Sequence, residues 1–268
     1  MAEPLVSDAL WTRIEPLIPK HHSPTPKGGR PPVEDRAALE GILFVLKTGI
    51  PWEDLPPQFG CCGMTCWRRL RDWQAAGVWD RLHQLLLSDL RKADQLDWSR
   101  AAVDSSSVRA VGGGEQPGPN PTDRRKPGSK HHVHTDANGV PLQVELSGAN
   151  RHDIRHLASL VAHIPPVRGK PGPPRSRPEQ VYGDRAYGSA NAHRLLRWLD
   201  IRPHLAGRGA KHGSGLGRFR WVVERTISWL HQFRRLRVRH DRRRDIHEGF
   251  LACAKSLICF RMLSPEFC

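Results

Sequence analysis

An Asn-Gly turn between two strand-like runs near the middle of the chain sets narrow limits on its fold. Residues 130–135 and 140–146 flank Asp136-Ala137-Asn138-Gly139, and Asn-Gly in such a setting predicts an antiparallel β-hairpin. A short extended run, Ser99 to Val103, precedes this hairpin and ends at Asp104. We therefore expect three strands in succession at the start of the second part of the chain.

Helix-like and strand-like segments alternate after the hairpin. We expect a helix over 152–163, a proline-rich loop over 164–178 and a strand over 180–183. A helix over 190–199, a strand over 201–204 and a long helix from about Phe219 follow. This order predicts an α/β fold, a mixed sheet flanked by helices. The first and fourth strands would be neighbours in such a sheet.

The chain before Trp98 has a different pattern, typical of helices alone. Apolar periodicity predicts helices over 7–18, 33–47 and 65–76, with Thr65 as the cap of the third, and another helix after Gly77. We therefore expect an N-terminal helical domain over residues 1–97 and a second domain over 98–268.

The third helix carries three arginines, Arg68, Arg69 and Arg71. A basic third helix is typical of a helix-turn-helix-like module, in which that helix enters the major groove of DNA. A dimerisation module is nearly as well supported, because this half of the chain is not basic. The loop before the second helix contains Gly29-Arg30-Pro31, which is better read as a linker than as a minor-groove arm.

Positive charge is concentrated in the second part of the chain. The formal net charge is +15. Residues 1–97 contribute −1 and residues 98–268 contribute +16, and ten arginines lie between positions 218 and 244. Such a concentration favours neutralisation of nucleic-acid phosphates. An anionic lipid surface is the weaker alternative, because the sequence has no lipidation motif or amphipathic anchor.

The sequence gives no indication of a membrane or of secretion. No apolar run approaches the roughly 18–20 residues that cross a bilayer, and the N-terminus lacks the pattern of a signal peptide. We expect a cytoplasmic protein, and we read its six cysteines as reduced thiols rather than as a disulfide framework or a zinc site.

Three acidic residues stand at prominent positions in the expected fold. Asp104 follows the first strand, Asp184 follows the fourth, and Glu224 lies on the long helix within a stripe that also holds Arg220, Ser228, His231 and Arg235. Each acid has a simpler reading. An Asp after a strand commonly forms a turn or caps a helix, and Glu224 can pair with Arg220 or Arg225.

Taken together, the three acids suit metal-dependent phosphodiester chemistry. Magnesium prefers hard oxygen ligands, and carboxylates converging from different elements can hold two ions roughly 3.5–4 Å apart. The surrounding arginines would hold the DNA backbone. Residue spacing and charge alone leave this reading and the simpler ones about equally supported.

The whole chain also resembles a known family. The strings that carry the resemblance are DALW at 8–11, GRPP at 29–32, LFVLKTGIPW at 43–52, DSS at 104–106, GSKHH at 128–132, GANRHD at 148–153, GDRAY at 183–187 and WVVERT at 221–226. In this order they resemble the IS5 group of bacterial insertion-sequence transposases, a branch of the IS4-like DDE transposases.

The resemblance implies an RNase H-like catalytic core, with Asp104, Asp184 and Glu224 as its acidic triad and Mg²⁺ or Mn²⁺ as cofactor. It also implies double-stranded DNA partners, namely the inverted repeats at the element ends and a target, and a homo-oligomer that brings two ends together. The broader IS4-like signature has a Tyr and a Lys where this chain has Gly217 and His231.

DNA-phosphate contacts are expected from residues near that signature. Arg220 matches its Arg, and Arg234 and Arg235 could replace the missing lysine, so the expected DNA-contacting residues are Arg220, His231, Arg234, Arg235, Arg68, Arg69 and Arg71. A non-catalytic DNA-binding copy and a general nuclease remain the alternatives. The first predicts DNA binding without magnesium-dependent nicks, and the second predicts cleavage with no preference for the terminal repeats.

Overall fold

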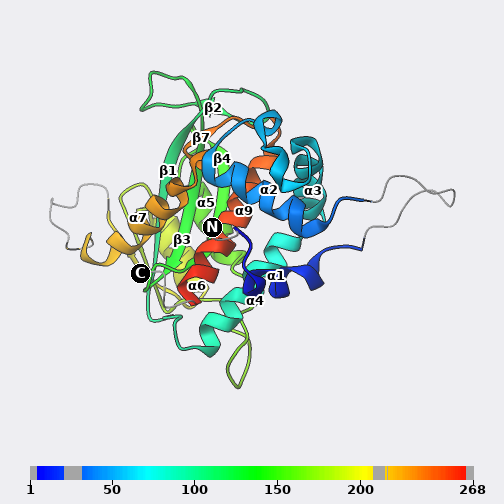
Figure 1. Ribbon diagram of the computed structural model, residues 1–268. Helices are drawn as coiled ribbons and strands as arrows, with labels where there is room; N and C mark the ends of the chain where they lie inside the picture. The colour runs from blue at the N-terminus through cyan, green and yellow to red at the C-terminus, as the bar shows by residue number, and fades with distance from the viewer. Residues whose placement is uncertain (1–4, 21–31, 208–214, 216, 264–268) are drawn as a thin grey trace.

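A mixed β-sheet forms the centre of the computed structural model, which describes residues 5–20, 32–207, 215 and 217–263. The Gly29-Arg30-Pro31 segment and Cys268 lie outside this part. The strands are β1 (Ala101–Ala110), β2 (Gly118–Pro119), β3 (Pro127–Asp136), β4 (Pro141–Gly148), β5 (Gln180–Gly183), β6 (Arg202–Leu205) and β7 (Val238–Arg239). Figure 1 shows helices packed around this sheet.

The strand order confirms the expected topology. β4, β3 and β1 are antiparallel neighbours, and β5 and β6 continue the sheet parallel to β1. The short strands β2 and β7 pair with the ends of β3 and β1. An antiparallel hairpin followed by two parallel strands with crossover helices is the RNase H-like arrangement that the sequence analysis predicted.

The predicted hairpin joins β3 to β4, and the side chain of Asp136 closes its turn. Oδ1 of Asp136 accepts hydrogen bonds from the backbone N–H groups of Asn138 and Val140 at 2.9 and 2.7 Å. Gly139 has a φ of +84°, a conformation that glycine adopts readily. The Asn-Gly signal therefore predicted the turn correctly.

Strand β1 is longer than the sequence predicted. The polar run after Val103 was expected to end the strand, but pairing with β3 continues to Arg109. The parallel pairing with β5, in contrast, ends at Val103 and Gly183. Asp104 therefore lies within a strand, at the point where the neighbouring strand β5 stops.

The helices are α1 (Asp8–Ile14), α2 (Asp35–Thr48), α3 (Gly63–Ala75), α4 (Val78–Lys92), α5 (Ile154–Ala162), α6 (Ala190–Trp198), α7 (Gly217–Gln232), α8 (Arg234–Arg237) and α9 (Arg244–Leu263), with 3₁₀ turns at Glu15–Leu17, Trp52–Asp54 and Pro57–Phe59. The predicted helices all form. The expected cap of α3 is wrong, because the helix begins at Gly63 with Cys62 as N-cap and Thr65 lies inside it.

Helices cover both faces of the sheet. On β3, the ring of His131 contacts His231 of α7 and His247 of α9, whereas the ring of the next residue, His132, stacks on His156 of α5. Successive side chains of a strand point to opposite faces. Helices α7 and α9 therefore lie on one face and α5 on the other.

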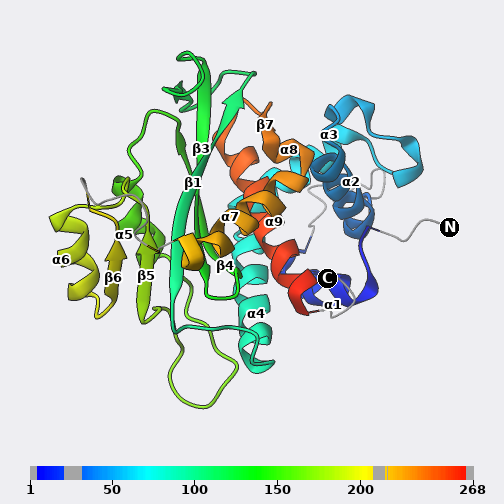
Figure 2. The same ribbon diagram turned by 90° about the vertical axis from the view of Figure 1, so that its left-hand side faces the viewer.

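Helix α9 joins the N-terminal helices to the sheet. In Figure 2 it lies between the sheet and helices α2 and α3, and it packs against α3, α4 and β4. Its residues Phe250, Cys253 and Ile258 belong to a hydrophobic core shared with Trp73 of α3 and Leu86 of α4. Among the described helices, none has the length and apolar character needed to span a membrane.

Candidate active site

Two of the predicted acids lie at the same edge of neighbouring parallel strands. Val103 pairs with Gly183, the last residue of β5, so Asp104 and Asp184 both follow the final paired position. Oδ1 of Asp184 accepts a hydrogen bond from the backbone N–H of Ala186 at 2.8 Å, which fixes the turn after β5. The topology therefore brings together two carboxylates that are 80 positions apart in the sequence.

Glu224 is held near this edge by helix α7. Val222, Val223 and Thr226 are buried beneath the helix, and the Thr226 hydroxyl donates to the carbonyl oxygen of Gly139 at 2.6 Å. These contacts fix the rotation of α7, which packs against β1, β3 and β5. Glu224 itself is exposed, one helical turn after Arg220, which bonds to Asp104 of β1.

Asp104 lies near enough to both other predicted acids for their charges to affect its pKa. Burial raises the pKa of Asp104, while the positive charge of Arg220 and a hydrogen bond from the Ser105 N–H lower it. The negative charges of Asp184 and Glu224 raise the pKa further. The charges of both other acids of the predicted triad therefore affect the pKa of Asp104.

Arg220 provides the counter-charge of this cluster. Its Nη2 donates to Oδ2 of Asp104 at 2.9 Å, and the two side chains are 17% and 18% exposed. Arg220 was expected to pair with Glu224 or to hold DNA phosphates, but here it bonds across to β1. Arg225 is also directed away from Glu224, toward the carbonyl oxygen of Asn138.

The donor chemistry of the cluster fits a divalent metal ion, although the side chains are not arranged as a metal cage. Carboxylate oxygens are the ligands that magnesium and manganese prefer. One oxygen of Asp104 already accepts a hydrogen bond from the positively charged Arg220 guanidinium. Within the described residues, no group of three or more His, Cys, Asp or Glu side chains has metal-binding geometry. An ion bound at Oδ2 of Asp104 would compete with Arg220 for that oxygen.

A polar network supports the strand from the opposite face. The Ser105 hydroxyl and Nζ of Lys130 donate to Oδ1 of Asp153, at 2.8 and 2.9 Å. Burial alone would raise the pKa of Asp153, but these two hydrogen bonds and the Lys130 charge lower it overall. Asp153 is therefore held as a carboxylate, and it fixes the backbone next to Asp104.

Tyr187 completes the surroundings of the cluster. The side chain is fully buried, and burial raises its pKa, as do the nearby charges of Asp153, Asp104 and Asp184. Its hydroxyl has no hydrogen-bond partner among the described residues. Neither Tyr187 nor the Ser105–Lys130–Asp153 network was predicted as functional, although all four residues lie in the strings that carried the family resemblance.

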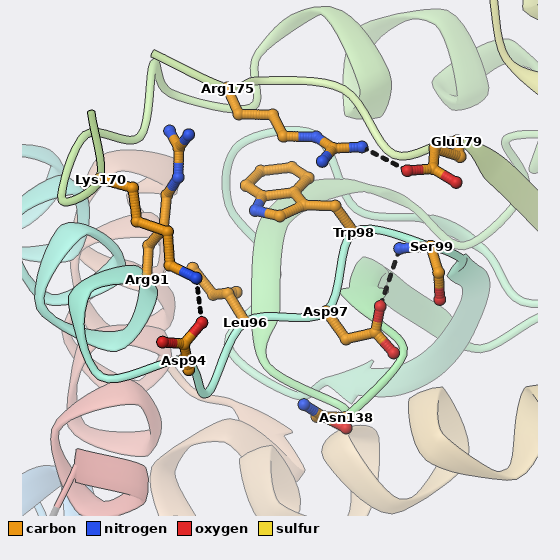
Figure 3. Close-up of a pocket in the computed structure, with 10 residues that line it drawn as sticks. All are labelled: Arg91, Asp94, Leu96, Asp97, Trp98, Ser99, Asn138, Lys170, Arg175 and Glu179. Carbon is orange, nitrogen blue, oxygen red and sulfur yellow. Dashed lines mark hydrogen bonds and ion pairs between the residues drawn. The ribbon is translucent and has the colours of Figure 1, made fainter. Parts of the chain in front are cut away.

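A pocket of about 560 Å³ lies beside the residues that precede β1, and none of the three acids lines it (Figure 3). Trp98 and Asn138 line it, together with two ion pairs. Lys170 bonds to Asp94, and Arg175 bonds to Glu179 at 2.8 Å. Because these cations are already neutralised by neighbouring acids, the pocket is a poor site for a polyanion.

Comparison with known families decides the classification. Residues 99–259 match the family described as "Transposase DDE domain", and residues 6–83 match "Putative transposase of IS4/5 family (DUF4096)". The chain belongs to the IS4/5 family of DDE transposases. This membership confirms the family predicted from the sequence.

Relatives of this transposase include two proteins of Burkholderia cepacia. A putative transposase for insertion sequence element IS402 is 56% identical over 146 residues, which is 54% of this chain and 69% of that protein. An uncharacterized 16.2 kDa protein of the same element is 64% identical over 129 residues, 47% of this chain and 88% of that protein.

Among solved structures, the catalytic domain of the Mos1 mariner transposase aligns with 75% of this chain and 94% of its own. The identity is 12% and the TM-score is 0.26, which is too low to equate individual residues.

One expected DNA contact of the transposase is corrected by its structure. Helix α7 ends at Gln232, so Arg235 leaves the predicted stripe and is 5% exposed. Its guanidinium binds Asp241 at 2.9 Å and the carbonyl oxygen of Ile50 at 3.1 Å. His231 faces inward, with its Nε2 buried and its ring against His131. The Arg235 guanidinium is therefore not available to a phosphate in this conformation, whereas the side chain of His231 is half-buried.

The other predicted DNA-contacting arginines lie in varied surroundings. Arg234 and Arg68 are exposed. Arg69 pairs with Asp35 of α2 at 3.2 Å, and its side chain is only 12% exposed. Arg71 pairs with its neighbour Asp72 at 2.7 Å. Arg68 and Arg234 thus remain the candidates with accessible charge outside the acidic cluster.

The described cysteines are unbridged. Cys66, Cys253 and Cys259 are buried and Cys61 is half-buried, whereas Cys62 is exposed. The sulfur atoms of Cys61 and Cys66 are 3.3 Å apart.

Proposed function

We propose that this protein binds the terminal inverted repeats of its insertion sequence, cuts the DNA there and joins the released ends to a target. Water attacks the phosphorus at the element boundary, and the bond from phosphorus to the 3′ oxygen breaks, leaving a 3′-hydroxyl and a 5′-phosphate. The 3′-hydroxyl then attacks a target phosphodiester. A new phosphorus–oxygen bond forms there, and the 3′ oxygen of the target leaves.

Asp104, Asp184 and Glu224 are the proposed catalytic residues, and their carboxylates would hold Mg²⁺ or Mn²⁺. The observation that carries this assignment is geometric: Asp104 and Asp184 both follow the last paired position of the neighbouring parallel strands β1 and β5, and Arg220, one helical turn before Glu224, bonds to Asp104. When bound, a pair of ions would activate the attacking hydroxyl group and stabilise the leaving oxygen. An acidic cluster that already needs Arg220 as counter-charge is suited to a divalent cation.

The remaining roles follow from the charge and placement of the side chains. Arg220 would hold a DNA phosphate once it leaves Asp104, and exposed Arg234 and Arg68 would contribute phosphate contacts that set the register of the duplex. Asp153 and Lys130 would keep the Asp104 backbone in place. Because transposition joins two element ends, we propose a homo-oligomer acting on bacterial DNA in the cytoplasm.

The N-terminal helices pack on the rest of the chain through α9. We propose that residues 1–97 form a helical DNA-binding or dimerisation module and that residues 98–268 form the catalytic domain. The hydrophobic core shared through α9 would hold the module in a fixed position relative to the acids.

The test is a cleavage assay with labelled duplexes and the full chain. One duplex carries the inverted repeat that flanks the reading frame, and a second carries the same bases in scrambled order. We expect nicks at the element boundary only with Mg²⁺ or Mn²⁺ and only on the first duplex. Binding without cleavage would support a non-catalytic DNA-binding protein, and equal cleavage of both duplexes would support a general nuclease.

A further inference from the structure

Two cysteines among the N-terminal helices lie close enough to be joined. The sulfur atoms of Cys61, just before helix α3, and Cys66, in the first turn of α3, are 3.3 Å apart. A disulfide needs about 2.05 Å between its sulfur atoms, so these two would have to approach by only about 1.3 Å. The pair is close in sequence as well as in space, so a bond between the sulfur atoms would require no movement of distant segments.

Helix α2 leaves room for the two sulfur atoms because it has a glycine opposite them. Gly41 is buried in α2, and a Cβ atom at this position would lie 2.5 Å from the sulfur of Cys66 and 3.5 Å from that of Cys61. A side chain at position 41 would therefore displace the buried thiol. The thiol of Cys61 also donates to the carbonyl oxygen of Ala37, one turn earlier in α2, at 3.6 Å. Both sulfur atoms are thus held side by side against one helix.

A pocket gives small molecules access to this pair. Its volume is about 790 Å³, and its lining includes Cys61, Cys62, Thr65 and Arg68. Cys61 is half-buried in the pocket wall, whereas Cys66 is completely buried. An oxidant that enters the pocket therefore meets the sulfur of Cys61 first, and the sulfur of Cys66 is in contact with the product.

The surroundings of the two thiols give them different reactivity. Burial raises the pKa of Cys61, and the hydrogen bond with Cys66 lowers it in part. Burial and the same hydrogen bond both raise the pKa of Cys66, and more strongly. Cys61 therefore ionises before Cys66. Because the thiolate is the reactive form, and the pKa of Cys61 lies above its ordinary value, oxidation at Cys61 should become faster in alkaline solution.

We propose that Cys61 and Cys66 form a reversible disulfide when hydrogen peroxide or another hydroperoxide enters this pocket. The Cys61 thiolate attacks one peroxide oxygen, the O–O bond breaks, and Cys61 becomes a sulfenic acid while one water is released. The sulfur of Cys66 then attacks that of Cys61, and the S–O bond breaks. The proton of the Cys66 thiol leaves with the hydroxyl group as a second water. The two thiols thus lose two electrons, which reduce hydrogen peroxide to water, and a thiol reductant reverses the bond.

The disulfide would fix the segment before α3 to the first turn of that helix, which carries Arg68 two residues after Cys66. In reducing surroundings the pair stays as two thiols, the form present in the structure. This modification site is separate from the acidic cluster and does not depend on the proposed function.

Cys62 offers a matched comparison at the next position. It is exposed, and a hydrogen bond with the hydroxyl of Thr65, at 3.3 Å, lowers its pKa. If exposure and thiolate content alone decided where a disulfide forms, Cys62 would be one of its two residues. The geometry predicts instead that the bond joins Cys61 to Cys66 and forms without Cys62.

The experiment exposes the folded full chain to hydrogen peroxide at about pH 7.5 and about pH 8.5. Free thiols are then alkylated, and peptide mass spectrometry identifies the disulfides. We expect a bond between Cys61 and Cys66 in the wild type and in Cys62→Ser. It should form roughly tenfold faster at the higher pH and be reversed by dithiothreitol. Cys66→Ser should instead leave a sulfenic acid at Cys61, which dimedone traps.

Urea unfolding of Cys62→Ser checks that the disulfide belongs to the native fold. The oxidised form should unfold at a higher urea concentration than the reduced form, because the bond restricts the unfolded chain. A lower midpoint would overturn the inference, as would a disulfide that joins other cysteines in place of this pair. Two free thiols at Cys61 and Cys66 after peroxide treatment would overturn it too. None of these results bears on the proposed function, which the end-cleavage assay tests separately.

Discussion

The guanidinium of Arg220 lies 2.9 Å from Oδ2 of Asp104, so an arginine on helix α7 neutralises an acid on the central strand. This ion pair links the two groups of residues that transposition chemistry requires, the acids that would hold metal and the arginines that would hold DNA. As long as the bond persists, one oxygen of Asp104 is unavailable to a metal ion.

We therefore predict that Arg220 competes with divalent metal. Arg220→Gln should bind Mn²⁺ about tenfold more tightly in the absence of DNA, because a charge-assisted hydrogen bond that the ion must displace is removed. Titration of free Mn²⁺ by electron paramagnetic resonance measures this affinity. Arg218→Gln removes the same charge from an exposed position on α7 and should change the affinity much less. Equal effects of the two variants would contradict direct competition.

Arg235 is predicted to stabilise the fold rather than to bind DNA. Its guanidinium is buried against Asp241 and donates to the carbonyl oxygen of Ile50, just after the end of α2. Arg235→Ala would leave Asp241 as an uncompensated buried charge, which costs about 3–5 kcal/mol. Urea unfolding measures this loss. Arg234→Ala, at the exposed neighbouring position, should stay within about 0.5 kcal/mol of the wild type.

The buried histidines of β3 predict a loss of stability in acid. Burial lowers the pKa of His134 to about 4, against a small opposing effect of its hydrogen bond with the Leu160 carbonyl. An unfolded histidine titrates near 6.5, so between pH 6.5 and 4 the unfolded chain takes up a proton that the folded chain does not. The contribution of His134 to the free energy of unfolding is therefore fully present above pH 6.5. It falls by up to about 3 kcal/mol as the pH decreases to 4.

Replacing His134 by Gln should therefore make the pH dependence of the urea midpoint shallower between pH 6.5 and 4. His152 is exposed and lies just before α5. His152→Gln should therefore leave the slope unchanged. If both variants keep the wild-type slope, the acid sensitivity does not arise from His134.

The sequence predicted the fold well because its strongest signals are local. The Asn-Gly turn, the capped or glycine-terminated helices and the short apolar strands each depend on neighbouring residues, and each formed close to its expected position. The adjacency of β1 and β5 followed from strand order alone. Asp104 and Asp184 could therefore be placed at one sheet edge without coordinates.

Helix α9 was missed for a physical reason. Buried residues such as Ile246, Phe250 and Cys253 lie on several sides of it, since it packs between the sheet and the N-terminal helices. A helix buried on most of its surface lacks the one-sided apolar pattern that marks an amphipathic helix. Its role in joining the two parts of the chain was consequently not visible in the sequence.

The correction of Arg235 has a different origin. The stripe of Arg220, Glu224, His231 and Arg235 assumed one continuous helix, but α7 ends at Gln232 and Phe233 is extended. A break of this kind depends on tertiary contacts, here the binding of Arg235 to Asp241 and to the backbone after α2. Helical periodicity cannot show which arginines of a basic run are used internally.

The most direct test of the account is the rate of end cleavage by single triad variants, measured beside their DNA affinity. Asp104→Asn, Asp184→Asn and Glu224→Gln should each lower the Mg²⁺-dependent rate roughly a thousandfold or more and leave DNA binding nearly intact. Glu179→Gln, an exposed acid at the pocket beside the start of β1, should cut at the wild-type rate. Near-normal cleavage by any folded triad variant would contradict a shared three-carboxylate site.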